Sequence, residues 1–359
     1  MISSPHLAFV EHNLVALRNN KQGMAQVILF PGGRMSRYIK IAPATIALGF
    51  FLSGCGIGPG ATGSFERTLN VSGPIRLDLS TASGEVVITG GSSGKVQVHA
   101  NVRAHGWLFQ DAQKQLNEVI SNPPIEQRLD SIRIGKDFND FRNVAIDYTV
   151  EVPDATEVDV SVASGSVTVR KVHGPVSVDS ASGAVRVEQV SGSVKINSAS
   201  GSTNVSDLGD DLRVSSASGS VDASSVKGSV HVDALSGSIG IVNPGSRVDA
   251  NTASGSINVS GADNDVRAAS ASGGVTVVGN PSGNAYWNLK TASGGVTITV
   301  PSNAAFYLTA DATSGDIRTG VPIVVEEQGR HSLRARVGTG GGRVEIHTIS
   351  GAINIQRGS

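Results

Sequence analysis

Residues 181–219 read ASGAVRVEQVSGSVKINSASGSTNVSDLGDDLRVSSASG, and the spacing within this stretch decides the fold. The tripeptide Ala-Ser-Gly, or a close variant, returns every 18 residues, and its last residue is here named the corner glycine. Corner glycines fall at positions 165, 183, 201, 219, 237, 255 and 273. Later copies follow at Gly294, Gly315 and Gly351, after intervals of 21, 21 and 36, and an earlier copy stands alone at Gly84. A period held this strictly predicts a repeat architecture.

Each repeat contains two runs of alternating apolar residues. The first run places valine or isoleucine two and four residues after the corner glycine, as in Val167 and Val169. The second run places them eleven and thirteen residues after it, as in Val176 and Val178, and a single apolar residue such as Leu208 stands between the runs. Alternation with a period of two is typical of strands that bury one face. Each repeat therefore predicts two strands of about five residues joined by tight turns.

Stacking of such repeats is the expected fold. One repeat cannot bury its own valines, whereas stacked coils place like residues on like residues and rise about 4.8 Å each. We predict an all-β chain: a β-solenoid, similar to a parallel β-helix, with about ten two-strand coils of 18 residues. An antiparallel meander is the alternative, but it does not require one residue phase over six consecutive intervals.

The composition excludes several classes of protein. The chain has 359 residues and a formal net charge of −1, so it lacks the basic field that attracts nucleic acid. Its single cysteine excludes an intrachain disulfide framework and a cysteine-rich zinc site. Aromatic residues make up only 4% of the chain, which disfavours a large cofactor pocket with bulky walls.

A second informative stretch lies near the N-terminus, where residues 35–55 read MSRYIKIAPATIALGFFLSGC. The apolar run at 41–52 is shorter than the roughly 20 residues of a membrane span and fits the core of a secretory signal. Leu52, Ser53, Gly54 and Cys55 then resemble a bacterial lipobox. This resemblance implies cleavage before Cys55 and a lipid on its thiol. The alternative is an incidental cysteine after an apolar stretch.

Three N-terminal segments follow from this motif. Residues 1–34 are expected to be an upstream mis-start or a disordered extension, because Met35 begins a complete signal. Residues 35–54 are the expected lipoprotein signal peptide, and residues 55–64 a flexible, glycine-rich tether. Gly56 stands where aspartate retains enteric lipoproteins in the inner membrane, so we expect anchoring in the outer membrane, on its periplasmic or surface face.

Both ends of the repeat array are expected to be capped, because open solenoid ends expose unpaired strand edges. Residues 65–160 lack the period and are predicted to form a β-rich cap with one short helix at 111–120. Residues 161–359 are the predicted solenoid. Within it, residues 321–343 interrupt the period and are predicted to form a hairpin excursion beside the last coils.

Two stretches before the array carry a family resemblance. They are Gly84-Glu85-Val86-Val87-Ile88 and Asp147-Tyr148-Thr149-Val150-Glu151-Val152-Pro153. Together with the Ser-Gly-x-Val coils, they make residues 65–359 similar to a bacterial adhesin family with β-strand repeats, a domain of unknown function. The Tyr-x-Val-x-Val-Pro stretch is the most specific part. The resemblance implies an adhesive role and carries over no catalytic residues.

The sequence shows no convincing catalytic grouping. It has no HExxH motif and no phosphate loop, and no G-x-S-x-G elbow lies between a strand and a helix. The densest acidic group of the array, Asp207, Asp210 and Asp211, falls in a turn and is expected to be solvated. We therefore predict no enzyme activity, no cofactor and no metal site. A carbohydrate-active β-helix enzyme is the least favoured alternative, because it needs paired carboxylates.

Tyr286 and Tyr307 form the one candidate binding platform. Both lie eight residues before a corner glycine, in coils expected to be adjacent. Outward rings at these positions would stack about 5 Å apart and could hold a sugar ring or a partner. The alternative is that they pack beneath the excursion at 321–343.

These features together favour a lipid-anchored, extracytoplasmic protein with a structural or adhesive, surface-binding role. Its expected partners are the membrane, through the N-terminal lipid, and polysaccharides or protein surfaces of the cell envelope. Nucleic acid is not an expected partner. A self-assembling scaffold similar to bactofilin polymers, built by end-to-end stacking of coils, is the alternative.

Overall fold

The computed structural model describes residues 18–19, 25–26, 60–92, 94–106, 109–135, 143–281 and 283–358. The chain divides into two compact units, Met1–Gly56 and Ile57–Ser359. In the first unit, β1 (Arg18–Asn19) pairs antiparallel with β2 (Ala25–Gln26). The predicted signal peptide at 35–54 lies outside the described residues, as does most of the segment at 1–34. The repeat array lies in the second unit.

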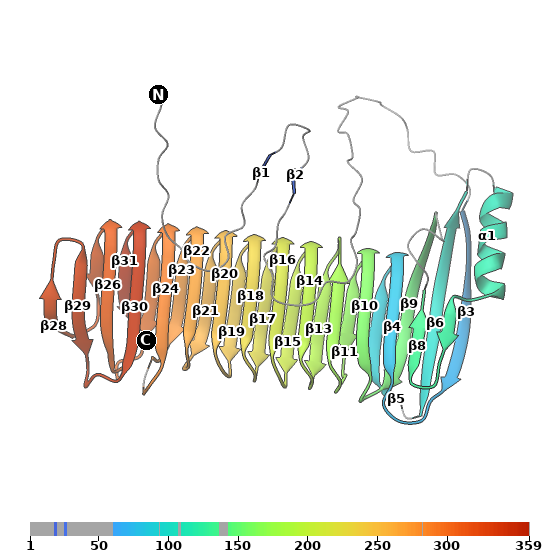
Figure 1. The fold of residues 1–359 in the computed structure, drawn as a ribbon, viewed down its shortest axis with the longest axis horizontal. Coiled ribbons are helices and arrows are strands. Elements are labelled where there is room, and N and C mark those ends of the chain that lie inside the picture. Colours follow the sequence, from blue (N-terminus) through green and yellow to red (C-terminus); the bar gives the residue numbers. More distant parts are fainter. Residues whose placement is uncertain are drawn as a thin grey trace. The chain divides into compact units, whose positions relative to one another are not determined.

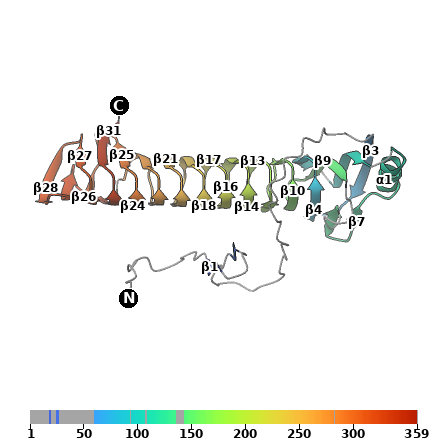
Figure 2. The ribbon, with the colours of Figure 1, turned by 90° about the horizontal axis from the view of Figure 1, so that it is seen from above.

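Two long layers of strands build the second unit, and the chain crosses from one to the other twice in every coil (Figures 1 and 2). In the central coils, the strands of the first sheet are β10 (Glu157–Ser164), β12 (Val176–Ser180), β14 (Val194–Ser200), β16 (Leu212–Ser218), β18 (Val230–Ser236), β20 (Val248–Ser254) and β22 (Val266–Ser272). The strands of the second sheet are β11 (Val167–Arg170), β13 (Val185–Val190), β15 (Thr203–Leu208), β17 (Val221–Val226), β19 (Ile239–Pro244), β21 (Ile257–Ala262) and β23 (Val275–Gly279). Neighbours in each sheet run parallel.

Pairing follows the sequence period. Val176 of β12 faces Val194 of β14, 18 residues further on, and Val194 faces Leu212 of β16. All three side chains are buried between the sheets in one continuous apolar core. The predicted β-solenoid of stacked two-strand coils is therefore confirmed.

The corner glycines explain why the tripeptide repeats. Gly183 and Gly201 have φ angles of 132° and 117°, in the region that favours glycine. A Cβ atom on Gly201 would also overlap the carbonyl oxygen of Gly183 in the preceding coil. Each coil therefore needs glycine both to turn the chain and to let neighbouring corners approach each other.

A β-rich region with one helix occupies the N-terminal end, as predicted. Its elements are β3 (Gly60–Asn70), β4 (Arg76–Ser83), β5 (Val86–Ser92), β6 (Lys95–His105), α1 (Phe109–Ser121), β7 (Ile125–Gln127), β8 (Ser131–Ile134) and β9 (Val144–Pro153). β9 pairs parallel with β5, and β6 and β3 then extend the second sheet by antiparallel pairing. Helix α1 covers the apolar face of β3, where Leu116 and Ile120 lie against Gly63.

Two predicted boundaries shift at this end. Strand β3 begins at Gly60, so the end of the predicted tether at 55–64 belongs to a paired strand. The lone corner at Gly84 belongs to a true coil, because β4 and β5 pair in register with β10 and β11. The predicted cap at 65–160 therefore includes the first coil of the solenoid. Its cap elements separate Gly84 from Gly165 in sequence, which hides the coil from a test for a constant period.

The C-terminal strands depart from chain order. They are β24 (Tyr286–Ser293), β25 (Val296–Val300), β26 (Phe306–Ser314), β27 (Ile317–Thr319), β28 (Ile323–Gln328), β29 (Ser332–Val337), β30 (Gly342–Ser350) and β31 (Ile353–Arg357). The last coil, β30 and β31, lies between the coil of β24 and β25 and the coil of β26 and β27 (Figure 1). The segment at 321–343 contains β28 and β29, which pair antiparallel with each other; β29 also pairs with β26, so these two strands end the first sheet.

Candidate functional site

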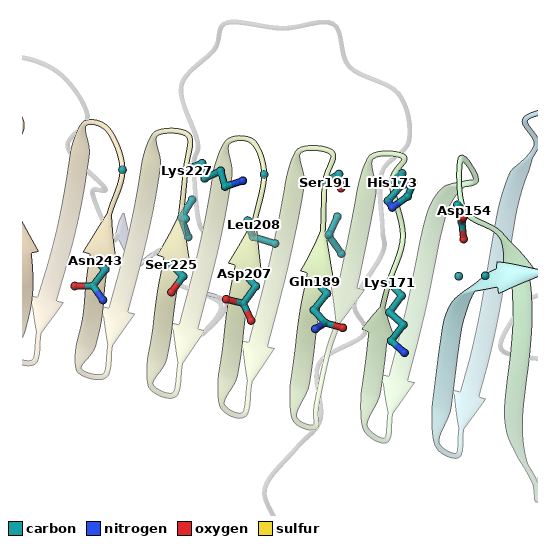
Figure 3. A pocket seen from close by; sticks show the side chains of 16 residues that line it. Asp154, Lys171, His173, Gln189, Ser191, Asp207, Leu208, Ser225, Lys227 and Asn243 are labelled. Carbon is teal, nitrogen blue, oxygen red and sulfur yellow. The ribbon is translucent and has the colours of Figure 1, made fainter.

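A groove runs along one edge of the solenoid, where strands of the second sheet end and the chain turns towards the first sheet (Figure 3). It has a volume of about 770 Å³ and follows the turns after β11, β13, β15, β17 and β19. Two rows of residues flank it. The first row, six residues after each corner glycine, holds Lys171, Gln189, Asp207, Ser225 and Asn243. The second row, two residues further on, holds His173, Ser191, Gly209, Lys227 and Gly245.

An unusual backbone conformation aligns the first row. All five of its residues have positive φ, between 51° and 57°, which residues with a Cβ rarely adopt. This conformation costs about 1 kcal/mol per residue. It turns the chain so that the next side chain points inwards, and burial of Val190, Leu208 and Val226 offsets the cost. As a result, the five side chains of the first row project outwards in the same direction (Figure 3).

The groove presents polar groups of both signs. Lys171, His173 and Lys227 supply nitrogen atoms, whereas Asp207 and, at the N-terminal end, Asp154 supply carboxylates. Within the described ranges, none of these five side chains takes part in an ion pair. Successive turns lie about 4.8 Å apart, a spacing comparable with the length of one sugar unit in an extended polysaccharide. The groove can therefore hold an extended polar chain through hydrogen bonds repeated along its length.

The carboxylates of the groove are too far apart to act as a pair. The carbonyl of Asp154 accepts a hydrogen bond from the N–H of His173, which places Asp154 one coil before that turn. Asp207 lies two coils beyond the same turn, so about 14 Å separates the two positions along the stack. All three residues of the predicted cluster are exposed, but Asp207 lies in β15, and only Asp210 and Asp211 lie in the turn that follows it. There Asp211 accepts the backbone N–H of Ser229 at 2.7 Å.

The predicted tyrosine platform is wrong in its geometry. Tyr286 of β24 faces Arg343 of β30, and Arg343 faces Tyr307 of β26, so a whole strand separates the two rings. Their separation is therefore about 10 Å instead of about 5 Å. The hydroxyl of Tyr286 donates to Glu345, and burial, followed by this hydrogen bond, raises its pKa. Insertion of the last coil between β24 and β26 is the physical cause of the error.

A polar patch covers the outward face of the first sheet in the central coils. His231 lies 2.9 Å from a carboxylate oxygen of Asp233 and 3.9 Å from one of Asp249. Asn251 donates to Asp233 at 3.0 Å from the next coil. The hydrogen bond between His231 and Asp233 raises the pKa of the histidine and lowers that of the aspartate. In the part of the chain that the structure describes, no group of three or more His, Cys, Asp or Glu residues is placed to hold a metal ion.

The predicted lipidation site cannot be placed in the fold. Leu52, Ser53, Gly54 and Cys55 lie outside the described residues. Among the helices that the structure does describe, none is long and apolar enough to cross a membrane.

The groove was missed by sequence reasoning, although a signal for it exists. Asp207, Asn243 and Gly261 share one phase of the repeat, six residues after a corner glycine. Asp, Asn and Gly are the residues that most readily adopt positive φ. Their recurrence at one position predicts an outward bend at every coil and hence a continuous edge with aligned side chains.

Comparisons with known proteins identify a family model that matches this sequence. A family model described as Toastrack DUF4097 matches residues 75–281 and 248–356, which together cover most of the chain. A solved structure described as a "putative cell adhesion protein" from Clostridium sporogenes aligns with 82% of this chain and 100% of its own, at 13% identity and a TM-score of 0.22. A superposition this weak carries no argument about the fold or the role. No match was found among curated proteins.

Proposed function

This chain belongs to the Toastrack DUF4097 family, and we propose that it is a non-catalytic adhesive protein that binds an extended polar polymer along its groove. We further propose that a lipid on Cys55 holds it in the cell envelope. One observation carries the binding role: the groove presents an outward polar side chain at the same repeat position over five successive turns, from Lys171 to Asn243. Weak contacts repeated in this way add up to durable attachment of a long chain, although each contact alone is easily lost.

The separation of the groove's carboxylates supports binding over catalysis. Hydrolysis of a glycosidic bond by two carboxyl groups requires them roughly 5 to 9.5 Å apart across one bond. Asp154 and Asp207 lie three coils apart, well beyond that range. The polar side chains between them are Lys171, His173, Gln189 and Ser191, which can hold a polymer by hydrogen bonds.

The lipobox-like stretch supports the envelope location. Leu52 to Cys55 follow an apolar run of signal length, and two or three acyl chains at Cys55 would anchor the chain durably. Gly56 favours the outer membrane. The partners that follow are the membrane, through the lipid, and a polysaccharide of the envelope, through the groove.

The anchor is tested by intact mass and membrane fractionation of the wild-type chain and Cys55→Ala. We expect a chain that begins at Cys55, carries the added mass of acyl chains and sediments with membranes. Cys55→Ala should lose both the added mass and the membrane association. An unmodified wild-type chain in the soluble fraction would contradict the proposed anchor.

The groove is tested by binding of the full chain to purified peptidoglycan sacculi and to a panel of envelope polysaccharides. Lys171→Ala, Asp207→Ala and Lys227→Ala are combined in one groove variant. Lys195→Ala is the matched control, because Lys195 is exposed on β14 in the first sheet and does not line the groove. The groove variant should lose most of the binding and Lys195→Ala should retain it. Equal binding by all three proteins would exclude the groove as the adhesive site.

Strand β28 favours a scaffold as a second candidate. It is the last strand of the first sheet in the described part of the chain, and Val324 and Val325 are 53% and 47% exposed. An unpaired edge with exposed valines is a site for end-to-end pairing with another copy. Light scattering over a range of concentrations distinguishes the two candidates. Growing filaments would favour the scaffold, and a constant monomer mass would exclude it.

A further inference from the structure

A row of alternating arginine and tyrosine side chains crosses four strands at the C-terminal end of the first sheet. Arg336 of β29 faces Tyr307 of β26, Tyr307 faces Arg343 of β30, and Arg343 faces Tyr286 of β24. These four residues form the Arg–Tyr row, and the strands that carry them lie side by side (Figure 1). Residues directly opposite each other in a sheet share one face, about 4.8 Å apart. All four side chains point away from the core, because the residues that alternate with them are buried.

Tyr307 is held in place while nearly half of it stays accessible. The residue is 47% exposed, and the hydroxyl end of its ring lies against Gly340 in the turn between β29 and β30. A Cβ atom at Gly340 would come within 2.8–2.9 Å of three atoms at that end of the side chain. Glycine therefore lets the turn close onto the ring. A half-exposed aromatic ring whose hydroxyl end packs against a turn offers an apolar face to a ligand.

Partners of the two arginines in the row decide whether they are available to a ligand. Within the described ranges, neither Arg336 nor Arg343 forms an ion pair. The acidic groups nearby are already engaged. Glu345 accepts the hydroxyl of Tyr286, and Asp265 accepts the backbone N–H of Tyr286 at 2.9 Å.

The neighbouring arginine of the same strand differs in this respect. Arg334 is bonded to Glu327 at 2.8 Å in the hairpin. Two guanidinium groups without an ion-pair partner among the described residues therefore flank one half-exposed aromatic ring. Guanidinium groups bind carboxylate and phosphate through two parallel hydrogen bonds.

We infer that the Arg–Tyr row is a binding site for an acidic oligosaccharide, whose sugar ring packs on Tyr307 while its carboxylate or phosphate groups bind Arg336 and Arg343. The arginines lie about two strand spacings, or about 10 Å, apart. Acidic groups on the sugars at either side of the packed ring can reach both of them. The apolar face of the sugar covers the ring, and the charged groups give specificity.

Charge in the surroundings favours this ligand over two others. A nucleic acid requires a broad basic field, and an anionic membrane surface attracts clusters of several lysines and arginines. Here Glu345, Asp265 and Glu327 interrupt the basic residues, and the net charge of the chain is −1. Two cations around one aromatic ring suit a few acidic groups on a defined molecule.

This site is separate from the groove. The groove follows turns at residues 171–245, whereas the Arg–Tyr row lies on β24, β26, β29 and β30. The inference therefore does not depend on the proposed role of the groove, and variants of each site serve as controls for the other.

The test measures binding of the full chain by titration calorimetry to short oligogalacturonides, phosphomannan oligosaccharides and neutral galactan oligosaccharides. We expect one or both acidic probes to bind and the neutral probe not to bind. Arg336→Ala and Arg343→Ala should each weaken binding about tenfold, the loss expected for one charged hydrogen-bonding partner. Tyr307→Ala should weaken it comparably, and Tyr307→Phe should retain most of it because the ring remains.

Matched controls separate this site from general effects. Arg334→Ala removes a paired arginine from the same strand as Arg336 and should leave the affinity unchanged. The combined groove variant of Lys171, Asp207 and Lys227 should also leave it unchanged. Circular dichroism melting curves establish that each variant is folded, which is expected because the altered side chains are at the surface.

Several results would overturn the inference. One is failure of both acidic probes to bind the wild-type chain, and another is equal binding of the neutral probe. Equal competition by inorganic phosphate would reduce the row to a general anion site. Preferential binding to phosphatidylglycerol vesicles would identify a membrane contact instead. Loss of binding in the groove variant, with no effect of Arg336→Ala or Arg343→Ala, would place the acidic oligosaccharide in the groove and leave the proposed function intact.

Discussion

Two regions of the solenoid use the same corner but differ in the order of their coils. Between Gly165 and Gly273 the coils stack in chain order, so each new coil pairs with the coil made just before it. After Pro281 the order breaks, because the coil with Gly351 lies between the coils with Gly294 and Gly315. The comparison shows that stacking of like on like fixes which face a strand buries and leaves the choice of neighbour to the connections.

The inserted coil is stabilised by its position, because it is paired with a neighbouring coil on both sides. Val344 and Ile346 of β30 face Trp287 and Leu289 of β24 on one side and residues of β26 on the other. All of these positions on β30 and β24 are buried. A chain end that is paired on both sides frays less than a terminal coil with a free edge. The free edge of the first sheet lies instead at β28, in the hairpin of β28 and β29.

Removal of the inserted coil is the strongest test of the comparison. Deletion of residues 342–359 leaves a slot between the coil of β24 and the coil of β26, with unpaired edges on both sides. We expect fast hydrogen exchange throughout β24 to β29 and association of the opened edges. Exchange in β12 to β18 should stay slow, because repeats depend mainly on their nearest neighbours. Hydrogen exchange read by mass spectrometry measures both regions in one sample.

A synthetic peptide of residues 342–358 sharpens this result. Added to the truncated chain, it should fill the slot and restore protection in β26 and β29. Slow exchange in these strands without the peptide would show that the coils on either side can close onto each other, and the inserted coil would then have no special role in this end of the solenoid.

Substitution of a corner glycine in the regular region is expected to have the next largest effect, which is a loss of stability. Gly219→Ala should destabilise the chain by more than about 3 kcal/mol, because its Cβ would overlap the carbonyl of Gly201. Gly73→Ala is the matched control: its φ is 87°, but no atom lies within 4 Å of the added Cβ. That change should cost only about 1 to 2 kcal/mol from backbone strain. Urea unfolding measures both, and equal losses would mean that strain alone makes the corner require glycine.

The order of the regular coils was predictable from sequence, and the order of the last coils was not. In the central coils the connections between strands are short, so Val176, Val194 and Leu212 pair in chain order with the equivalent residues of neighbouring coils. At the C-terminus, β24, β26 and β30 share one apolar phase, with Leu289, Leu308 and Ile346 all pointing inwards. An apolar pattern identifies the buried face of a strand, but it contains no information about which of two equivalent strands lies next to it.

The candidate sites differ in the same way. The tyrosine platform depended on which coils are adjacent, so the inserted coil made it wrong. The groove depends only on the regular phase, and Asp207, Asn243 and Gly261 predict the positive φ that shapes it. The lipidation of Cys55 depends on neither and stays a prediction.

Buried inward hydroxyls give a smaller contrast, between positions with and without a hydrogen-bond partner; in the regular coils Ser270, like Thr291, donates to a corner carbonyl, that of Gly255 at 3.0 Å. Thr291 of β24 donates to the carbonyl of Gly273 at 2.9 Å, whereas the hydroxyl of Ser216 in β16 has no hydrogen-bond partner among the residues that the structure describes. Thr291→Val should cost about 1 kcal/mol, because it removes this bond while keeping the shape of the side chain. Ser216→Ala should be neutral or slightly stabilising, because a buried unpaired hydroxyl is lost. Urea unfolding of the two variants tests the contrast, and a clear loss for Ser216→Ala would mean that its hydroxyl has a partner in solution.

The smallest expected effect is a pH dependence confined to the regular coils. The hydrogen bond with Asp233 raises the pKa of His231, with a further contribution from Asp249, while burial and Arg213 oppose the shift. A raised pKa means that the stabilisation from protonated His231 is complete below the unfolded-state value of about 6.5 and is lost as pH rises through the folded-state pKa.

The pKa of Asp233 is lowered, so its contribution is present above the unfolded-state value of about 3.9 and is lost as pH falls. The pair should therefore stabilise the first sheet most between these limits. NMR titration of the His231 ring should give a midpoint above the ordinary value, and Asp233→Asn should move it down. Asp249→Asn, which removes the more distant carboxylate at 3.9 Å, should move it less. An unchanged midpoint in Asp233→Asn would mean that the carboxylate does not hold the proton on His231.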